Sequence, residues 1–463
     1  MDDFIKKYQQ IMTMAMEAGI KSVPMSYKNG YPYVGDRKRF YEFISACHRG
    51  YAKAQSQLVR EIVTLRNDDA LTDSEKWYRE LLYRKIADTI AFILLDHQTH
   101  VIRRLGIHDD PPFTPSDDLY AALEEAEKLN NESRKTFALL CDLTTFIHVC
   151  DLIRVDFRAD SPKISFIEIK RGEVNSMLLS ELEKSENIKG LLTKLSDNPN
   201  IESKYIPQAK RILKQKMRLQ NISEIIRTDK GIDAKFNRPI FLKNPVIELE
   251  FYDSILSDLF EIAHENQLAA TTIHYCIHIG VGFSKERQLA SKYAHYALSY
   301  VINKAATDTE SPIQGLREEI KILVPANEMW LLIHPFKSNL TGLFNRPFTI
   351  WKVDRKYLFE LMNHTLVLLV IFDLAAFLWL ARSQGLKAGL SSRKEASRLT
   401  QKYGKRAIPT FGNRCITISY QNKEWKMLGG MLSRFVNDFV PPLDVLKHFK
   451  TTPNIYEDNP SDK

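Results

Sequence analysis

One segment of the sequence, CDLIRVDFRADSPKISFIEIKRG, places carboxylates and a lysine where a hydrolytic site can form. Its two halves are rich in β-branched and aromatic residues, and the RADSP between them is typical of a turn, which predicts a β-hairpin over 146–170. In a hairpin centred on that turn, Asp151 lies opposite Glu168. Opposed residues point to the same face, and Lys170, two positions after Glu168, points there as well.

The expected pairing of two carboxylates indicates a metal site. Like charges set opposite each other destabilise a sheet unless something compensates them, and a divalent cation between them would do so. Mg²⁺ suits this donor set because it takes a couple of carboxylates, keeps several waters and accepts a substrate phosphate, and Mn²⁺ is expected to substitute for it. Lys170 would orient a water and offset charge on the attacked phosphate. The chemistry expected here is hydrolysis of a phosphodiester.

These residues resemble the PD-(D/E)xK nucleases, a restriction-endonuclease-like superfamily that includes Holliday-junction resolvases and nucleases of repair or phage defence. The resemblance consists of Asp151, followed by Glu168-Ile169-Lys170 at the end of an apolar strand. It implies that Asp151 and Glu168 bind the metal, with the backbone carbonyl of Ile169 as a further ligand. Asp151, Glu168 and Lys170 are the catalytic residues that this resemblance implies.

The segment also departs from the family pattern at two places. Cys150 stands where many members have proline, and Asp156 offers a competing carboxylate. Asp156 is five residues from Asp151 and so faces the other way in a regular strand, and a bulge would be needed to bring it in. We therefore favour Asp151. A hairpin with a solvated Glu168-Lys170 edge is the structural alternative.

A basic helix is expected after the hairpin, over the sequence PQAKRILKQKMRLQNISEIIR. Its clustered lysines and arginines exceed what solubility requires, and such a helix can lie along a phosphate backbone. Members of the family often carry Gln, Lys or Arg on this helix, which implies Gln208, Lys210 and Arg211. We expect Lys214 to hold nucleic acid together with them.

The fold expected for the whole chain is α+β. Apolar residues at helical spacing predict a helical N-terminal region, 1–76. The resemblance implies a small mixed sheet flanked by helices for the nuclease core, 77–232, and mixed strand and helix patterns predict a C-terminal α+β domain, 233–463, to which we assign no role. Family members often carry an acidic residue on the helix before the sheet, for which Asp88 and Glu80 are the candidates.

The composition indicates the number of domains, the charge of a binding partner and the cellular compartment. The 463 residues are 44% hydrophobic and 26% charged, enough apolar material for more than one domain. The formal net charge of +8 suits a partner that carries phosphates. The five cysteines are scattered and form no CxxC pair, which argues against a disulfide framework or a zinc ribbon and favours the reducing cytoplasm.

No membrane partner is expected. The N-terminus lacks the basic start, apolar centre and cleavage site of a secretory signal. The most apolar stretch, 365–381, falls short of a spanning length and carries Asp373 at its centre. We therefore expect it to form a buried core helix.

Two other patterns carry possible chemistry. His274, Cys276 and His278 alternate along one expected strand and could face the same side as metal ligands, although a half-buried strand face explains them more simply. Arg103 and His108 match the loose spacing of HEPN ribonucleases, which cleave RNA without a metal.

Together these patterns predict a cytoplasmic, Mg²⁺-dependent nuclease. The resemblance implies that it is an endonuclease acting on DNA rather than RNA, in restriction or antiviral defence. A partner protein or a second copy of the chain could activate it. Two alternatives remain: a non-catalytic nucleic-acid-binding or scaffold protein on the same fold, and a metal-independent HEPN-like RNase that uses Arg103 and His108.

Overall fold

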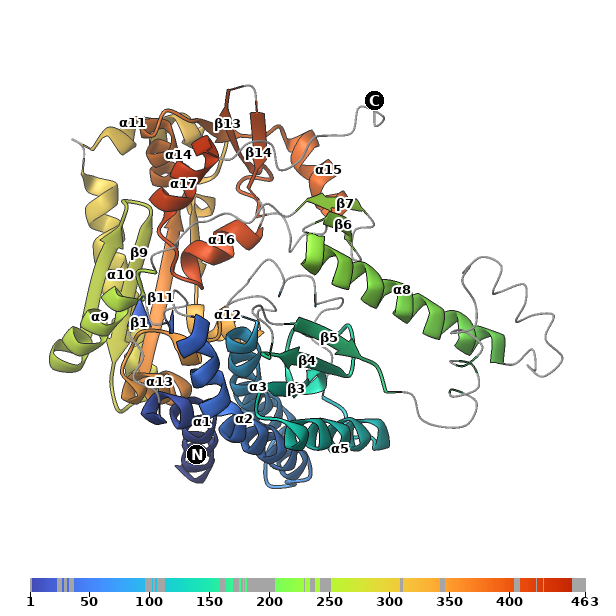
Figure 1. Ribbon diagram of the computed structural model, residues 1–463. Coiled ribbons are helices and arrows are strands. Elements are labelled where there is room, and N and C mark those ends of the chain that lie inside the picture. The colour runs from blue at the N-terminus through green and yellow to red at the C-terminus, as the bar shows by residue number, and fades with distance from the viewer. Residues whose placement is uncertain are drawn as a thin grey trace. The chain divides into compact units, whose positions relative to one another are not determined.

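The computed structural model divides into two compact units (Figure 1). One, the N-terminal unit, consists of Asp2–Lys28 and Pro32–Asn244, and the other, the C-terminal unit, consists mainly of Pro245–Lys463. The division expected from the sequence, 1–76, 77–232 and 233–463, stays a prediction. The structure describes residues 2–22, 27–28, 31–32, 37–95, 102, 105, 113–158, 163–169, 175, 178, 180, 205–228, 230–233, 238–241, 251–308, 311–341, 346–403, 409–421, 423–427 and 429–451.

The α+β class expected from the sequence is confirmed, because helices combine with several small sheets. The paired strands of these sheets run antiparallel in both units. The parallel pairing of a mixed sheet is therefore not seen within the described part of the chain. Among the helices that the structure describes, none has the length and apolar character needed to cross a membrane.

Four long helices begin the N-terminal unit: α1 (Asp2–Ser22), α2 (Arg37–Arg66), α3 (Asp73–Leu94) and α5 (Asp117–Glu132). The short strands β1 (Tyr27–Lys28) and β2 (Tyr31–Pro32) lie between the first two. Helices α1 and α3 both pack against α2. Thr72 and Glu75 form a capping box at the start of α3, and the Ser116 hydroxyl caps α5, where the sequence favours Ser116 or Asp117 as the cap.

A three-stranded meander follows, made of β3 (Thr136–Leu140), β4 (Leu152–Asp156) and β5 (Lys163–Ile167) in that spatial order. The short helix η1 (Cys141–Leu143) starts the connection from β3 to β4. Strand β3 is an edge strand, and side chains satisfy its outer backbone groups. Asn130 bonds the amide and carbonyl of Ala138 at 2.7 and 3.1 Å, and Gln55 accepts from the amide of Leu140 at 2.7 Å.

The last elements of this unit are α8 (Ile206–Thr228) and a two-stranded pair, β6 (Lys230–Asp233) with β7 (Arg238–Phe241). Helix α8 is the long green helix of Figure 1, and it contacts both β5 and β6. Its apolar face, which includes Ala209, Ile212 and Leu213, is buried. The opposite face is exposed to solvent, and it carries basic residues.

The C-terminal unit is built on a four-stranded antiparallel sheet in the order β10, β11, β9, β8. These strands span Trp330–Ile333, Leu366–Asp373, Ile277–Phe283 and Leu268–Ile273. Helix α9 (Asp253–Asn266) contacts β8 and β9, and helix α10 (Arg287–Thr307) packs across β8, β9 and β11. Two glycines of β9 permit that packing: a Cβ on Gly282 would lie 2.1 Å from the carbonyl oxygen of Ala290, and one on Gly280 would lie 2.6 Å from that of Ala294.

The rest of this unit consists of short helices and a three-stranded sheet in the order β12, β13, β14. The helices are α11 (Pro312–Lys321), η3 (Ala326–Glu328), α12 (Pro335–Thr341), η4 (Phe348–Ile350), α13 (Arg355–Asn363), α14 (Leu374–Ser383), α15 (Arg393–Tyr403), α16 (Gly429–Val436) and α17 (Pro442–Thr451). The strands are β12 (Lys387–Leu390), β13 (Ile416–Tyr420) and β14 (Lys423–Lys426).

The expectation of one core helix over 365–381 is wrong. The first half of that stretch is β11 and the second half is α14. Strand β11 is buried on both faces, so its sequence is a continuous apolar run that resembles a buried helix. Asp373 marks the change: its side chain caps α14 by accepting from the amide of Ala376 at 3.1 Å, and it forms a buried ion pair with Arg317.

The expectation that His274, Cys276 and His278 alternate on one strand is also wrong. The chain turns there, because β8 ends at Ile273 and β9 begins at Ile277, which is its partner in the ladder. His274 and Tyr275 have left-handed backbone, with φ of 47° and 63°. His274 and Cys276 therefore belong to a tight turn, and His278 lies buried on the following strand.

Candidate metal and nucleic-acid site

The register of the β4–β5 hairpin is the one that the sequence predicts. Leu152 pairs with Ile167, and the ladder runs to Asp156 opposite Lys163. Beyond Leu152 and Ile167 the regular pairing stops, since the amide of Asp151 bonds the carbonyl of Ile167 and its carboxylate bonds the amide of Ile169, so Asp151 and Glu168 both lie at the open end of the hairpin. The structure places Asp151 directly before β4 and Glu168 directly after β5, and both are half-buried.

Hydrogen bonds to the backbone and to the carboxylate of Asp151 hold this residue in place. Its carbonyl accepts from the amide of Cys141 at 2.9 Å, and its amide donates to the carbonyl of Ile167 at 3.1 Å. Its carboxylate oxygen Oδ2 accepts from the amide of Ile169 at 2.5 Å. The aspartate thus joins the end of β3 to the residue between Glu168 and Lys170, where the resemblance expects a metal ligand.

Glu168 connects the hairpin to the basic helix. Its Oε1 accepts a hydrogen bond from Nε2 of Gln215 on α8, at 2.8 Å. Lys170 lies outside the described residues, so its place in the site stays a prediction. The two carboxylates and the backbone of Ile169 are therefore the part of the expected site that the structure describes.

A third carboxylate, Asp142, lies on η1 near Asp151. Its pKa is raised, first because surrounding protein atoms displace water from the carboxyl group, although much of the residue's surface is exposed, and second because of the charge on Asp151. The guanidinium of Arg84 partly offsets this. Negative charge is therefore concentrated at this end of the sheet.

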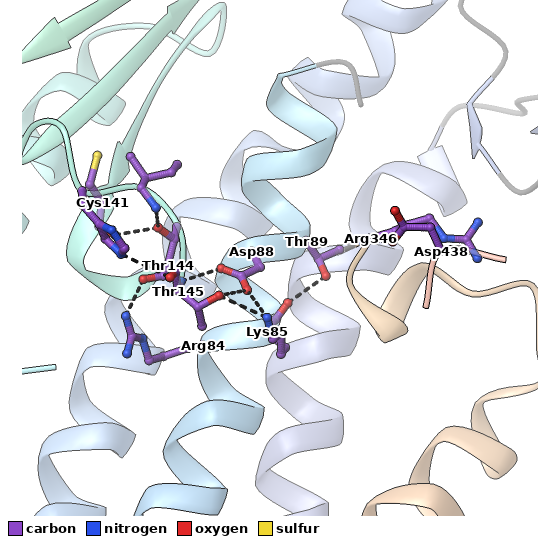
Figure 2. Close-up of polar contacts among 11 residues, drawn as sticks. Arg84, Lys85, Asp88, Thr89, Cys141, Thr144, Thr145, Arg346 and Asp438 are labelled. Carbon is purple, nitrogen blue, oxygen red and sulfur yellow. Dashed lines mark hydrogen bonds and ion pairs between the residues drawn. The ribbon is translucent and has the colours of Figure 1, made fainter. Parts of the chain in front are cut away.

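A buried network on α3 holds the loop that leads into the site (Figure 2). Asp88 pairs with the ammonium of Lys85 at 2.8 Å and accepts from both the amide and the hydroxyl of Thr145, each at 2.7 Å. Arg84 donates to the carbonyl of Thr144 at 2.5 Å. Asp88 and Lys85 are each about 1% exposed. Asp88 therefore holds the loop between β3 and β4, and its carboxylate is occupied by these buried donors.

The other two acidic candidates are also engaged. Glu80 is buried and pairs with Arg66 of α2, with 2.7 Å between Nη2 and Oε2. Asp156 forms a forked pair with Arg158, with 2.9 and 3.0 Å from Nε to its two carboxylate oxygens. Chiefly through this hydrogen bonding, Arg158 holds the pKa of Asp156 at about 2. An arginine thus neutralises each of these two carboxylates.

The basic residues expected to bind nucleic acid lie on α8. Lys210, Arg211 and Lys214 are exposed, and within the described part of the chain none of the three takes part in an ion pair. Gln208 is half-buried and donates to Oδ1 of Asn175 at 2.6 Å. The helix thus presents unneutralised cations on one face, while Gln215 attaches it to Glu168.

The donor set suits a hard cation that keeps most of its waters. Asp151 and Glu168 offer carboxylate oxygens at one end of the hairpin, which is the number of protein carboxylates that Mg²⁺ usually takes. No group of three or more His, Cys, Asp or Glu side chains close enough to hold a metal ion occurs among the described residues. The two carboxylates that the structure describes here are therefore a donor set suited to a Mg²⁺ that keeps most of its waters.

Four contributors to the site were not predicted from the sequence. Strand β3 was not expected, so Asp142, which follows it, had no place in the pattern. Gln215 was overlooked among its basic neighbours. Lys85 and Thr145 act through contacts between residues distant in sequence, which no local motif marks. Arg103 and His108 of the HEPN alternative lie outside the described residues.

Comparison of the chain with protein family models, with curated proteins and with solved structures finds no match in any of the three.

Proposed function

We propose that the chain is a Mg²⁺-dependent nuclease that hydrolyses phosphodiester bonds in DNA, cutting internally. The observation that carries the proposal is the hairpin register, which brings Asp151 and Glu168 to one end of a small sheet beside a basic helix. The resemblance to PD-(D/E)xK nucleases adds Lys170 to this pair. A cytoplasmic location, a role in restriction or antiviral defence, and activation by a partner or a second copy belong to the same proposal.

Each residue of the proposed site would have a separate role in hydrolysis. Asp151 and Glu168 would hold the metal, which when bound polarises a phosphoryl oxygen and makes a coordinated water more acidic. Lys170 would orient the attacking water. That water forms a new bond to phosphorus, the bond from phosphorus to one ester oxygen breaks, and that oxygen leaves as a hydroxyl after taking up a proton.

The surrounding contacts support this division. The amide of Ile169 fixes the direction of the Asp151 carboxylate, and Gln215 fixes that of Glu168. Groups held in this way lose little freedom when a metal and a phosphate bind. Lys210, Arg211 and Lys214 would hold the phosphate backbone without reading its sequence.

The test is cleavage of supercoiled plasmid, linear duplex, single-stranded DNA and RNA by the purified chain, with Mg²⁺, Mn²⁺ or EDTA. Wild type should nick plasmid only with a metal, and Glu168→Gln and Lys170→Ala should abolish cutting while the far-ultraviolet circular dichroism is unchanged. Asp156→Asn is the matched control, because it removes a carboxylate from the same hairpin on the other face. Cutting that persists in EDTA and in both variants would overturn the proposal.

The same assay separates the alternatives. A non-catalytic binding protein would bind DNA without cutting it under any condition, and Glu168→Ala would change only its stability. A HEPN-like RNase would cut RNA in EDTA and lose that activity in Arg103→Ala and His108→Ala.

A further inference from the structure

Helix α10 of the C-terminal unit has an unusual charge pattern. Its 21 residues, RQLASKYAHYALSYVINKAAT, include Arg287, Lys292 and Lys304 but no aspartate or glutamate. Most surface helices of this chain mix both signs. Helix α11, for example, carries Arg317 and Lys321 together with Glu318 and Glu319. A long helix without acidic residues leaves its cations uncompensated by neighbours on the same helix.

The two faces of α10 are sharply different. Small and apolar residues, among them Ala294 and Leu298, pack against β9 and β11. The other face carries Lys292, Tyr296, Tyr300 and Lys304, spaced four residues apart, and we call these four residues the α10 stripe. Positions four apart follow one another along a helix surface, so the stripe is continuous.

The stripe is exposed and unengaged. Tyr296 and Tyr300 are 67% and 64% exposed, the largest values among the exposed tyrosines of the described residues. Within that part of the chain neither ring contacts another ring, and neither Lys292 nor Lys304 is in an ion pair. Two large rings on neighbouring turns of one helix offer apolar faces that a ligand can cover.

The order of lysine, tyrosine, tyrosine and lysine along the stripe suits a strand of unpaired nucleotides. Aromatic rings offer faces on which unpaired bases stack, and lysines beside them attract phosphates. Successive members of the stripe rise by about 6 Å along the helix, more than the roughly 3.4 Å step of a stacked duplex strand. Bases of an extended strand can therefore stack on the rings rather than on one another.

We propose that the α10 stripe binds a single-stranded nucleic acid, with bases stacked on Tyr296 and Tyr300 and phosphates against Lys292 and Lys304. Duplex is excluded from the stacking because its bases are already paired and stacked. The site lies wholly within the C-terminal unit, so it holds or fails independently of the nuclease proposed at Asp151 and Glu168.

The experiment measures binding of the full chain to labelled oligothymidylate, oligouridylate and duplex DNA by fluorescence anisotropy in EDTA, where metal-dependent cutting cannot occur. Tyr296→Ala with Tyr300→Ala should weaken binding to the single strands by at least about fivefold per ring and leave duplex binding unchanged. Tyr296→Phe with Tyr300→Phe keeps the ring faces and should bind like wild type. Tyr120→Ala, an exposed tyrosine of α5, is the control.

The charges are tested separately. Lys292→Gln with Lys304→Gln should reduce the slope of log affinity against log salt for single strands by about 1.4, at about 0.7 for each phosphate that the variant no longer neutralises. Oligothymidylate and oligouridylate together distinguish DNA from RNA as the preferred strand, and tighter binding of either supports the proposal.

Three results would overturn it. The alanine variant could bind both single strands as tightly as wild type, or the phenylalanine variant could lose as much affinity as the alanine variant. The alanine variant could also change the mass measured by sedimentation while its affinity stays the same, which would make the stripe a contact between two copies of the chain.

Discussion

Two aspartates of the N-terminal unit differ in burial and in the charges around them. Asp88 is buried on α3, where one ammonium and two donors of Thr145 satisfy its charge. Asp151 is half-buried beside a second acidic residue, Asp142, whose pKa it helps to raise. A carboxylate that the fold neutralises completely acts in the structure, whereas carboxylates gathered near a surface are candidates for binding a cation, as we propose for Asp151 and Glu168.

The comparison also explains why a motif alone does not identify a metal ligand. Asp88 and Glu80 stand on the helix where the resemblance expects an acidic residue, yet each pairs with a basic side chain of the helices. Asp151 is distinguished by the hairpin register rather than by its local sequence.

The largest expected effect is on catalysis. Asp151→Asn should lower the cleavage rate by about 10³-fold or more, because metal polarisation of the phosphate contributes several kcal/mol. The unfolding free energy should change by less than about 1 kcal/mol, since the amide still accepts from Ile169. Cleavage at saturating Mg²⁺ and urea denaturation measure the two quantities. A rate within about tenfold of wild type would remove Asp151 from the site.

Asp88→Ala should lower the unfolding free energy much more than Asp151→Asn does. The change leaves the Lys85 ammonium buried without its counter-ion, so the unfolding free energy should fall by about 3–5 kcal/mol. Combining it with Lys85→Met should recover the part of the loss that is due to the unpaired ammonium, while the amide and hydroxyl of Thr145 still lack their acceptor. Urea denaturation of both variants checks this, and a loss below about 1 kcal/mol in the single variant would contradict the structural role.

The basic face of α8 is expected to affect DNA binding rather than cleavage or stability. Lys210→Gln should weaken duplex DNA binding on every sequence and reduce the salt slope by about 0.9. Lys53→Gln on α2, another exposed lysine, is the control. Anisotropy titrations in EDTA at several salt concentrations provide the slopes. Equal slopes for the two variants would show that α8 makes no phosphate contact.

The smallest effect is expected at Asp156. Its hydrogen bonds to Arg158 lower its pKa from the ordinary 3.8 to about 2. A lowered carboxyl pKa stabilises the fold fully above pH 3.8, and this stabilisation is lost as the pH falls through about 2. Because Arg158 is exposed and the pair lies at the surface, Asp156→Asn should cost at most about 1 kcal/mol at neutral pH. Urea denaturation at neutral and acidic pH tests this, and a difference that grew on acidification would be inconsistent with the pairing.

The sequence predicted elements whose signals are local. The turn between β4 and β5 sets the register through Asp156 and Lys163, and Ser116 marks the start of α5. The sequence over 286–305 also predicts a helix, and the structure has α10 there. In each case the deciding residues are neighbours in sequence.

Elements that depend on distant partners were missed or mistaken. Strand β3 is short and buried throughout, so it shows no alternation. Its outer edge is satisfied by Asn130 and Gln55, which lie on two different helices. The stretch 365–381 was mistaken for a helix because both faces of β11 are buried. At the site, Asp142 and Gln215 were missed because only tertiary packing brings them close to the motif.

The glycines of β9 fix the orientation of α10 and so lower the conformational entropy that the helix can lose when a ligand binds. Because the helix backbone lies directly on Gly280 and Gly282, it cannot roll about its own axis without colliding with the strand. The outward face of α10 is therefore held in one direction before any ligand arrives. Such preorganisation removes part of the ordering cost that binding otherwise carries, so more of the contact energy would appear as affinity.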